Sequence, residues 1–366
     1  MAAFVGKKEA PLEAALARAY ELLAPCKMPV IAGQGADVAG MRAALKVASR
    51  LGGALDFCRG PGATNLIRTI IDKGLMFTTP REARARADVL LMVGPSIGRS
   101  EAIIDILQGQ PVLSAGNGAK RDVLWLCPAN ATEELSRFDM LVADAELAAI
   151  HGIIALLNAA LRGRPIEREG FGGLFRQDYE EIAGRLITAR FGVIAFAPED
   201  LDSLAIEALL GFAETLNAST RVTLLPLITN GPAQTATMVS GWTTGFPPRL
   251  GFARGYPEFD LWRFDAARMN RNGEADGLIW LSPFEAKGPD WRAELPTVAI
   301  TRPGAVFTRP PEVLIETEIP GADTRAELFS ERLQALVAAP AIPLGGYPTP
   351  GAVLERLLGH MEAQGA

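Results

Sequence analysis

The sequence predicts an α/β protein of two Rossmann-like units, each built on a parallel sheet. Short apolar strands that end in turn residues alternate with amphipathic helices, which is the rhythm of a parallel sheet with crossover helices. The helix–strand–helix–strand order of residues 10–57 recurs in residues 180–227, and an Ala-Asp pair opens a buried strand in each half, at 87–88 and at 275–276. Because a parallel sheet needs helices on both faces, we expect two such units packed with pseudo-twofold symmetry.

The first half begins with an amphipathic helix at residues 10–24, where apolar residues recur at helical spacing and Pro25 follows. A glycine turn at Gly33 and Gly35 then separates a buried strand from the next helix. The further elements expected here are the strand 29–32, the helix 40–51, the strand 54–57, a helix end and a strand within 85–95, and strands at 111–116 and 122–128.

The second half repeats this order with an insertion, after a linking helix at 145–161 and a polar stretch at 162–170. The elements expected are the helix 180–190, the strand 192–198, the helix 201–216, the strands 221–227, 277–283 and 313–317, and helices near 324–337 and 350–363 in a Pro-rich tail. The sequence therefore predicts a first unit at 1–162, a second at 163–322, and a tail at 323–366 that wraps the core.

The composition favours a protein with protein partners. Charged residues make up 21% and hydrophobic residues 49% of the chain, so the surface is poor in charge, as a large partner interface would explain. The net charge of -6 and the lack of a Lys/Arg stripe argue against a nucleic-acid partner. We expect neither a signal peptide nor a membrane span. The three dispersed cysteines, Cys26, Cys58 and Cys127, indicate a reducing compartment and hence the cytoplasm.

A first candidate site is the segment GQGADVAG at 33–40, between a strand and a helix, where phosphate-binding turns occur. Its third glycine, Gly40, comes two positions late for the G-x-G-x-x-G pattern. Asp56 is the one acidic residue near a ribose-binding position. The alternative, which we favour, is a tight turn without a ligand.

Metal ligands are scarce in this sequence. The two histidines, His151 and His360, lie far apart in apolar helix patterns, and no cysteine pair has the spacing of an iron–sulfur site, so we expect neither zinc nor a cluster. Cys58 follows a strand end and precedes Arg59, whose charge would lower the thiol pKa, so it is a candidate nucleophile or metal ligand. A buried apolar cysteine is the favoured alternative for Cys58, and for the other two cysteines.

The segment 241–262 is dense in Trp, Gly, Pro and Arg and is expected to be a long irregular loop. Trp242 and Tyr256 are candidates for stacking on a ring, and Arg254 for holding an anion through two hydrogen bonds. An aromatic loop at a subunit contact is an equal alternative.

At this loop the sequence resembles a known family, the B subunits of formylmethanofuran dehydrogenases. The resemblance covers about residues 10–310, and its motifs fall in the same order along both chains. The matching residues are Cys58-Arg59-Gly60-Pro61, Ala87-Asp88 to Gly94, Trp242, Thr244-Gly245, Phe252, Arg254-Gly255, Pro257 and Glu274-Ala275-Asp276. The resemblance implies a molybdopterin oxidoreductase-like fold with reduced cofactor domains.

In that family a pterin-bound tungsten or molybdenum reduces carbon dioxide to formate, with electrons supplied by an N-terminal iron–sulfur cluster. Cys58 matches the metal-ligating cysteine and Arg254 the catalytic arginine, but Arg59 replaces a histidine, and arginine cannot shuttle protons. We also expect the N-terminal cluster and the longer C-terminal part to be missing. The resemblance thus implies a relic site, with Cys58, Arg59 and Arg254 at former catalytic positions and Gly33, Gly35, Gly60, Trp242 and Gly245 in the former cofactor cleft.

Such shortened B subunits are similar to those of the formyltransferase/hydrolase complex of methylotrophic bacteria. That complex converts formyl-tetrahydromethanopterin to tetrahydromethanopterin and formate through formylmethylofuran, without electron transfer. The resemblance implies a non-catalytic structural subunit that binds no metal or pterin. Its expected partners are a formyltransferase subunit, a zinc amidohydrolase-like subunit and a further structural subunit. The alternative is an active subunit with molybdopterin and molybdenum or tungsten.

Overall fold

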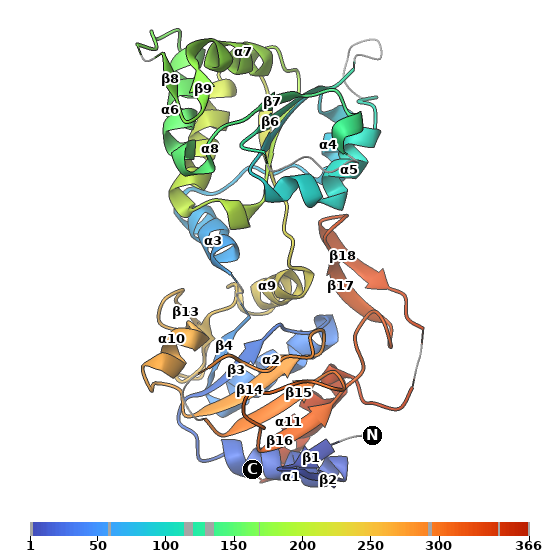
Figure 1. Cartoon of the computed structure of the whole chain (residues 1–366). Coiled ribbons are helices and arrows are strands. Elements are labelled where there is room, and N and C mark those ends of the chain that lie inside the picture. Colours follow the sequence, from blue (N-terminus) through green and yellow to red (C-terminus); the bar gives the residue numbers. More distant parts are fainter. Residues whose placement is uncertain are drawn as a thin grey trace. The chain divides into compact units, whose positions relative to one another are not determined.

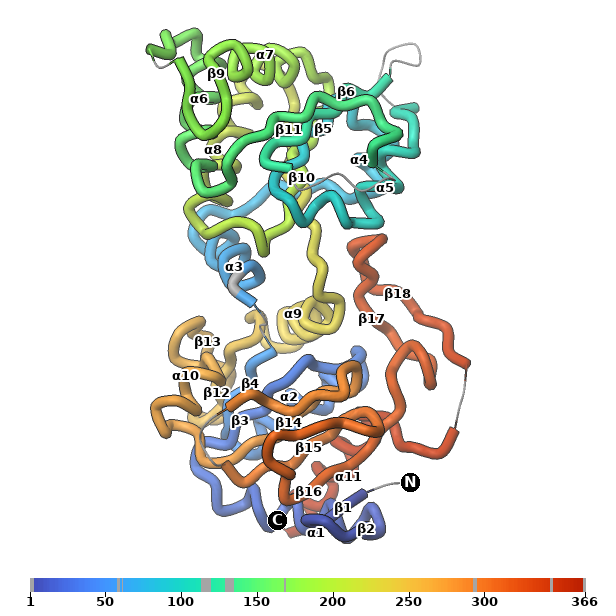
Figure 2. The backbone as a smooth tube through the Cα atoms, in the orientation of Figure 1, coloured from blue at the N-terminus to red at the C-terminus, as the bar shows by residue number. Residues whose placement is uncertain are grey.

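The computed structural model describes residues 3–57, 60–112, 120–128, 135–167, 169–291, 295–342 and 345–364 (Figures 1 and 2). The chain folds into two compact units. The terminal unit, which contains both chain ends, combines residues 1–59, 230–329 and 336–366, and the central unit combines residues 60–229 and 330–335. This division differs from the predicted boundaries at residues 162 and 322, because the chain leaves the terminal unit after β4 and returns to it only at residue 230.

The terminal unit contains a mixed sheet with the strand order β13-β12-β4-β3-β14-β15-β16-β1-β2. The strands from β4 to β16 are parallel, and the outer pairs are antiparallel. The strands are β1 (Ala3–Val5), β2 (Lys8–Ala10), β3 (Pro29–Gly33), β4 (Ala54–Asp56), β12 (Leu250–Gly251), β13 (Glu258–Phe259), β14 (Gly277–Ser282), β15 (Thr297–Thr301) and β16 (Val313–Glu316). The helices are α1 (Leu12–Leu23), α2 (Val38–Leu51), α9 (Gly231–Thr244), α10 (Ala266–Arg271) and α11 (Pro350–Gln364).

The central unit contains a fully parallel sheet with the order β11-β10-β5-β6-β7. Its strands are β5 (Val89–Val93), β6 (Asp122–Leu126), β7 (Leu141–Ala143), β10 (Gly192–Phe196) and β11 (Val222–Pro226), with a separate pair β8 (Gly170–Phe171) and β9 (Leu174–Phe175). Its α-helices are α3 (Pro61–Lys73), α4 (Pro80–Arg86), α5 (Glu101–Gln108), α6 (Ile150–Leu161), α7 (Arg176–Ile187) and α8 (Ser203–Leu216). Short 3₁₀ turns are η1 (Ser96–Arg99), η2 (Leu135–Arg137), η3 (Leu147–Ala149) and η4 (Pro198–Asp200).

The two parallel sheets share one strand order, β4-β3-β14-β15-β16 in one unit and β11-β10-β5-β6-β7 in the other. The repeated strand–helix–strand segments, β3–α2–β4 and β10–α8–β11, each supply one side of a sheet, and the segment opened by an Ala-Asp pair supplies the other. Both sequence repeats are therefore real structural repeats. Each unit takes its two parts from different halves of the sequence, however, so the α/β prediction is confirmed while the sequential division is not observed.

The repeated aspartates have the same structural role in both units. Asp276 accepts hydrogen bonds from the backbone N–H groups of Lys27 (2.6 Å) and Met28 (2.9 Å), directly before β3. Asp88 accepts hydrogen bonds from the N–H groups of Arg190 (2.8 Å) and Phe191 (3.0 Å), directly before β10. Each carboxylate thus ties the two central strands of its sheet together at their N-terminal ends.

The faces of the two sheets are covered differently. In the central unit, α4 and α5 pack on one face and α3, α6, α7 and α8 on the other, as predicted. In the terminal unit, α1, α2, α9 and α11 cover one face. The opposite face packs against α10 and against Trp291, Leu295 and Phe307 of the segments between β14, β15 and β16. The prediction of helices on both faces therefore fails for most of this second face.

Two local predictions differ from the structure, and a third falls largely on residues that the structure does not describe. The helix expected at 324–337 is a hairpin of β17 (Ala326–Ser330) and β18 (Ala335–Ala339). The expected loop 241–262 begins with the last turn of α9 and contains β12 and β13. The strand expected at 111–116 falls largely on residues outside the described ranges, and Pro111 and Val112 are not in a strand. Across the described residues, no helix has the length and apolar character needed to cross a bilayer.

Candidate functional site

Each sheet has one topological switch point, which is a pair of neighbouring parallel strands whose following connections lead in opposite directions along the sheet. It lies between β3 and β14 in the terminal unit and between β10 and β5 in the central unit. Open α/β sheets bind their ligands in the crevice outside the carboxyl ends of these strands. The residues that follow these four strands therefore decide whether either unit can hold a cofactor.

In the terminal unit, the side chain of Gln34 closes this crevice. Gln34 is 6% exposed, and its Oε1 accepts hydrogen bonds from Ser282 Oγ (3.0 Å) and from the N–H of Glu285 (2.8 Å). Gly33 has a φ of +134°, and a Cβ there would collide with the carbonyl of Leu281. Gly33 therefore permits close contact between β3 and β14, and the turn joins two protein segments.

The beginning of α2 carries a carboxylate where a ligand phosphate would lie. Asp37 is the N-cap residue, and its Oδ1 accepts a hydrogen bond from the N–H of Gly40 (3.1 Å). Burial raises the pKa of the Asp37 carboxyl, opposed by its backbone hydrogen bonds. Gly35 faces Met41 and Ala236, which belong to α2 and α9. The carboxylate of Asp37 occupies the N-terminus of α2, where a phosphate would otherwise bind. These residues therefore do not fit a cofactor phosphate, and the geometry is that of a tight turn.

The central unit has a matching hydrogen-bonded bridge at its own switch point. Asp200, in η4 after β10, accepts hydrogen bonds from Ser96 Oγ (2.6 Å) and from the N–H of Ser96 (2.8 Å), after β5. Gly94 has a φ of +93°, and a Cβ there would lie 2.5 Å from a carboxylate oxygen of Asp200. Sequence analysis missed Gln34, Ser282, Asp200 and Ser96. Their common signal is a polar side chain within four positions of a strand end.

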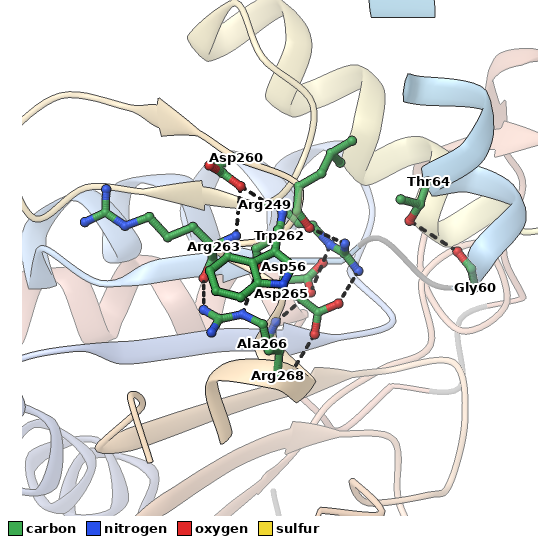
Figure 3. Close-up of polar contacts among 11 residues, drawn as sticks. Asp56, Gly60, Thr64, Arg249, Asp260, Trp262, Arg263, Asp265, Ala266 and Arg268 are labelled. Atoms are coloured by element: carbon green, nitrogen blue, oxygen red, sulfur yellow. Dashed lines mark hydrogen bonds and ion pairs between the residues drawn. The ribbon is translucent and has the colours of Figure 1, made fainter. Parts of the chain in front are cut away.

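Cys58 and Arg59 lie outside the described residues, between β4 and α3. On the β4 side, Asp56 is 8% exposed and accepts a hydrogen bond from the N–H of Ala266 (2.9 Å) (Figure 3). Arg249, whose φ is +77°, lies with its Nε 3.6 Å from Asp56 and its Nη2 2.6 Å from Asp265 (Figure 3). This ion-pair network ties the segment from β12 to α10 to the end of β4. On the α3 side, Gly60 is the N-cap residue with a φ of +84°.

The remaining predicted site residues lie on the surface of the terminal unit. The side chain of Arg254 is 62% exposed, and its Nη1 lies 3.4 Å from the carboxylate of Glu258. A hydrogen bond with Tyr256, together with the charge of Glu258, raises the pKa of Arg254. Trp242 is exposed on α9, and Gly245 ends that helix with a φ of +85°. Among the described residues, Arg254 forms no polar contact with α9 or with the 33–40 turn.

The other cysteines and the histidines have structural contacts. Burial raises the pKa of the Cys127 thiol to about 12, and burial together with Asp276 raises that of Cys26, so neither thiol is activated as a nucleophile. His151 contacts Asp202 (3.0 Å) and His360 contacts Glu13 (2.9 Å). Within the part of the chain that the structure describes, no three His, Cys, Asp or Glu side chains are grouped to hold a metal ion.

Comparisons with known proteins give two kinds of relatives, while no protein-family model matches the chain. The chain is 35% identical over 344 residues to the B subunit of the formyltransferase/hydrolase complex Fhc of Methylorubrum extorquens, a match that covers 93% of this chain and 91% of that protein. It is 24% identical over 369 residues to the B subunit of the tungsten-containing formylmethanofuran dehydrogenase 2 of Methanococcus maripaludis, covering 91% and 80% of the two chains.

A solved structure has the same fold over the whole length of the chain. The crystal structure of the formyltransferase/hydrolase complex FhcABCD from Methylorubrum extorquens, in complex with methylofuran, contains a chain that matches with a TM-score of 0.89 and 33% identity. The match covers 100% of this chain and 99% of the other.

Proposed function

The chain belongs to the family of B subunits of formyltransferase/hydrolase complexes, and from this membership we propose that it is a non-catalytic structural subunit of such a complex. Such a complex converts formyl-tetrahydromethanopterin to tetrahydromethanopterin and formate through formylmethylofuran. This conversion involves no oxidation or reduction. The transfer belongs to a formyltransferase subunit and the hydrolysis to a zinc amidohydrolase-like subunit. This chain and a further structural subunit complete the complex in the cytoplasm.

The two bridged switch points carry this proposal. Gln34 joins the ends of β3 and β14 in the terminal unit, and Asp200 joins the ends of β10 and β5 in the central unit, so hydrogen bonds within the protein occupy the position at which an α/β fold would hold a cofactor. The carboxylate of Asp37 at the beginning of α2 would repel a cofactor phosphate. Arg254, which matches the catalytic arginine of the dehydrogenases, is engaged on the surface by Glu258. These features support a relic site comprising Cys58, Arg59 and Arg254.

The second candidate is an active molybdenum- or tungsten-dependent dehydrogenase subunit, favoured by the retention of Cys58 and Arg254. Elemental and pterin analysis of the native complex separates the two. We expect molybdenum, tungsten and pterin to be far below one per chain, and formate to form from formyl-tetrahydromethanopterin without a redox dye. Stoichiometric metal and pterin would contradict the structural role.

Substitution of the relic residues provides a matched test in the assembled complex. Cys58→Ala and Arg254→Ala should each leave the rate of formate release within about twofold of the wild type, because a structural subunit would take no part in the formyl transfer or the hydrolysis. Arg81→Ala, at an exposed position on α4, serves as the control for the effect of an added substitution. A loss of activity in Cys58→Ala with the complex intact would favour the second candidate.

An exposed apolar patch on the central unit is the surface we assign to contact with the other subunits. Ile70, Ile71, Met76 and Phe77 are exposed at the end of α3 and in the segment that follows. Four large apolar side chains so close in sequence are unusual on a free surface and are typical of an interface. The adjoining sheet edge is already paired, because the backbone of Met76 and Thr78 hydrogen-bonds to Leu224 of β11. A partner would therefore contact the side chains of the patch and could not add a strand to this part of β11.

Ile71→Glu and Met76→Glu should lower the amount of the other subunits that co-purify with this chain by about tenfold, because a buried carboxylate in an apolar contact is costly. The control is Val142→Glu on β7, the opposite edge of the same sheet, where the exposed valine stands alone in sequence. Equal loss of partners in the control, or full retention in both patch variants, would exclude this patch as the contact.

A further inference from the structure

Trp262 is exposed to solvent, yet its backbone is fixed. The residue follows β13 in the terminal unit and is 69% exposed. Its N–H donates a hydrogen bond to the carboxylate of Asp260 (2.8 Å), and its carbonyl accepts one from Nε of Arg268 (2.8 Å) (Figure 3). The segment that carries the indole is thus held from both sides by side chains of its own unit.

The indole ring of Trp262 rests on a guanidinium group. The guanidinium carbon of Arg268 lies 4.0 Å from the centroid of the ring, which is a cation–π contact. The side chain of Arg268 is nearly buried, and both of its terminal nitrogens bind the carboxylate of Glu274, at 2.5 and 2.6 Å. Nη2 of Arg268 also donates to the carbonyl of Arg263 (2.6 Å). The ring therefore has a fixed support, while most of its surface remains accessible.

An exposed side chain that is already ordered is suited to binding. Ordering a tryptophan in solvent adds little burial to the folded chain, but the entropy of fixing the side chain is then not lost when a partner binds. Tryptophan and arginine are enriched among the residues that dominate the binding energy of protein interfaces. Trp242 on α9 is also exposed, but among the described residues no guanidinium group supports its ring. These two tryptophans thus differ in how firmly they are held.

Arg263 adds a charged group next to the indole. Its side chain is 52% exposed and points away from the ion-pair network of Asp56 (Figure 3). Nη1 of Arg263 lies 4.0 Å from Oε1 of Glu258, and the same oxygen lies 3.4 Å from Nη1 of Arg254. Two guanidinium groups thus share one carboxylate, and the contact of Arg263 is the longer of the two. A carboxylate on a partner surface would complete the pairing of Arg263.

We propose that Trp262 anchors a contact with another subunit of the complex, whose surface supplies an apolar pocket for the indole and a carboxylate for Arg263. The existence of that partner rests on the proposed function. The contact belongs to the terminal unit and is therefore different from the apolar patch at residues 70–77 of the central unit. Because β13 spans only Glu258–Phe259, side chains make this contact, and strand addition does not.

Hydroxyl-radical footprinting of the full chain, alone and in the native complex, tests the contact in the wild type. Oxidation of Trp262 should fall by at least about fivefold on assembly, because anchor residues are shielded from water. Trp242 is the reference for general changes in reactivity. Oxidation of Trp262 that does not fall, with Ile71 and Met76 protected in the same sample, would overturn this proposal and leave the proposed function standing. Slow oxidation of Trp262 in the chain alone would overturn it as well.

Substitutions provide the second test. Trp262→Ala and Arg263→Glu should each lower the amount of the other subunits that co-purify with this chain by about tenfold, and Trp262→Phe should lower it less. Both positions are exposed, so the variants should keep the circular dichroism spectrum of the wild type. The matched controls are Trp242→Ala and, at an exposed position of α2, Arg42→Glu. Full retention of the partners in Trp262→Ala and Arg263→Glu, or an equal loss in the controls, would overturn the proposal.

Discussion

Replacing Arg121 by methionine is expected to lower the free energy of unfolding of the central unit by about 3 kcal/mol. Arg121 is 6% exposed, and its guanidinium donates hydrogen bonds to the backbone carbonyls of five described residues. The acceptors are Ala87 (2.8 Å), Gly109 (2.9 Å), Arg84 (2.8 Å), Ala83 (3.5 Å) and Ile106. These carbonyls end α4 and α5, so one side chain caps the C-termini of two helices.

The physical reason for a large effect is that Arg121 is the donor to the carbonyls of Arg84, Ala87 and Gly109 among the described residues. The carbonyls of Ala83 and Ile106 also accept the N–H groups of Ala87 (2.9 Å) and Gly109 (3.1 Å). Burial lowers the pKa of Arg121 to about 10, so the group remains charged at neutral pH. Methionine fills similar space but leaves buried acceptors without donors, and each unsatisfied group has its own desolvation cost. Arg121→Lys keeps the charge but cannot reproduce the planar fork, so its loss should be intermediate.

Urea unfolding followed by circular dichroism measures this effect, with each unit fitted to its own transition. Arg81→Met on the exposed face of α4 is the matched control and should stay within about 0.5 kcal/mol of the wild type. A similarly small change in Arg121→Met would show that water reaches these helix ends and replaces the guanidinium.

The second large effect is expected at Asp56, where substitution by alanine should destabilise the terminal unit by about 3 kcal/mol. Asp56 and Arg249 are both nearly buried, with side chains 8% and 12% exposed. Removing the carboxylate leaves Arg249 with the carboxylate of Asp265 and the carbonyl of Leu261 as its described partners, and it deprives the N–H of Ala266 of its acceptor. A buried charge that loses part of its pairing is costly because water cannot compensate it.

Asp56→Asn separates the ion pair with Arg249 from the hydrogen bond with Ala266. The amide oxygen of asparagine can still accept the N–H of Ala266, while the negative charge is removed. Its loss should be smaller than that of Asp56→Ala, and a double-mutant cycle with Arg249→Leu should give a coupling energy above about 1 kcal/mol. Asp260→Ala is the control, since Asp260 is exposed and accepts hydrogen bonds from the N–H groups of Trp262 and Arg263. A loss of about 1 kcal/mol is expected there. Equal losses at positions 56 and 260 would contradict a special role for the buried pair.

Local patterns predicted the elements well where they carried their own signals. The strands β3, β5, β10 and β14 appear where apolar runs between turn residues predict them, and the Ala-Asp pairs mark the strands that Asp88 and Asp276 tie. The pattern failed at 326–339, where helix-forming residues occupy a hairpin. Its conformation depends on contacts such as the hydrogen bond of Phe329 with Thr235, which lies 94 positions away in the sequence. Such distant contacts override local propensity.

The candidate site shows the same limit of prediction from local sequence. The glycines of the 33–40 segment indicated a turn after a strand, and the structure contains that turn. The residue that closes it, Gln34, has its partners Ser282 and Glu285 at separations of 248 and 251 positions. Asp200 likewise meets Ser96 across 104 positions. No local pattern distinguishes a glutamine or aspartate that bridges two strands from one that faces solvent.

The sequence by itself determined the α/β class, the two repeated segments and the resemblance to the B subunits of formylmethanofuran dehydrogenases. These features depend on patterns among residues that are close together in the sequence. Only the tertiary structure decided which repeats share a sheet. It joins β3 and β4 to β14, and β10 and β11 to β5, across halves of the chain. Parallel pairing depends on backbone hydrogen bonds between segments that crossovers of very different lengths can bring together. Which strands pair with one another is therefore decided only in the folded chain.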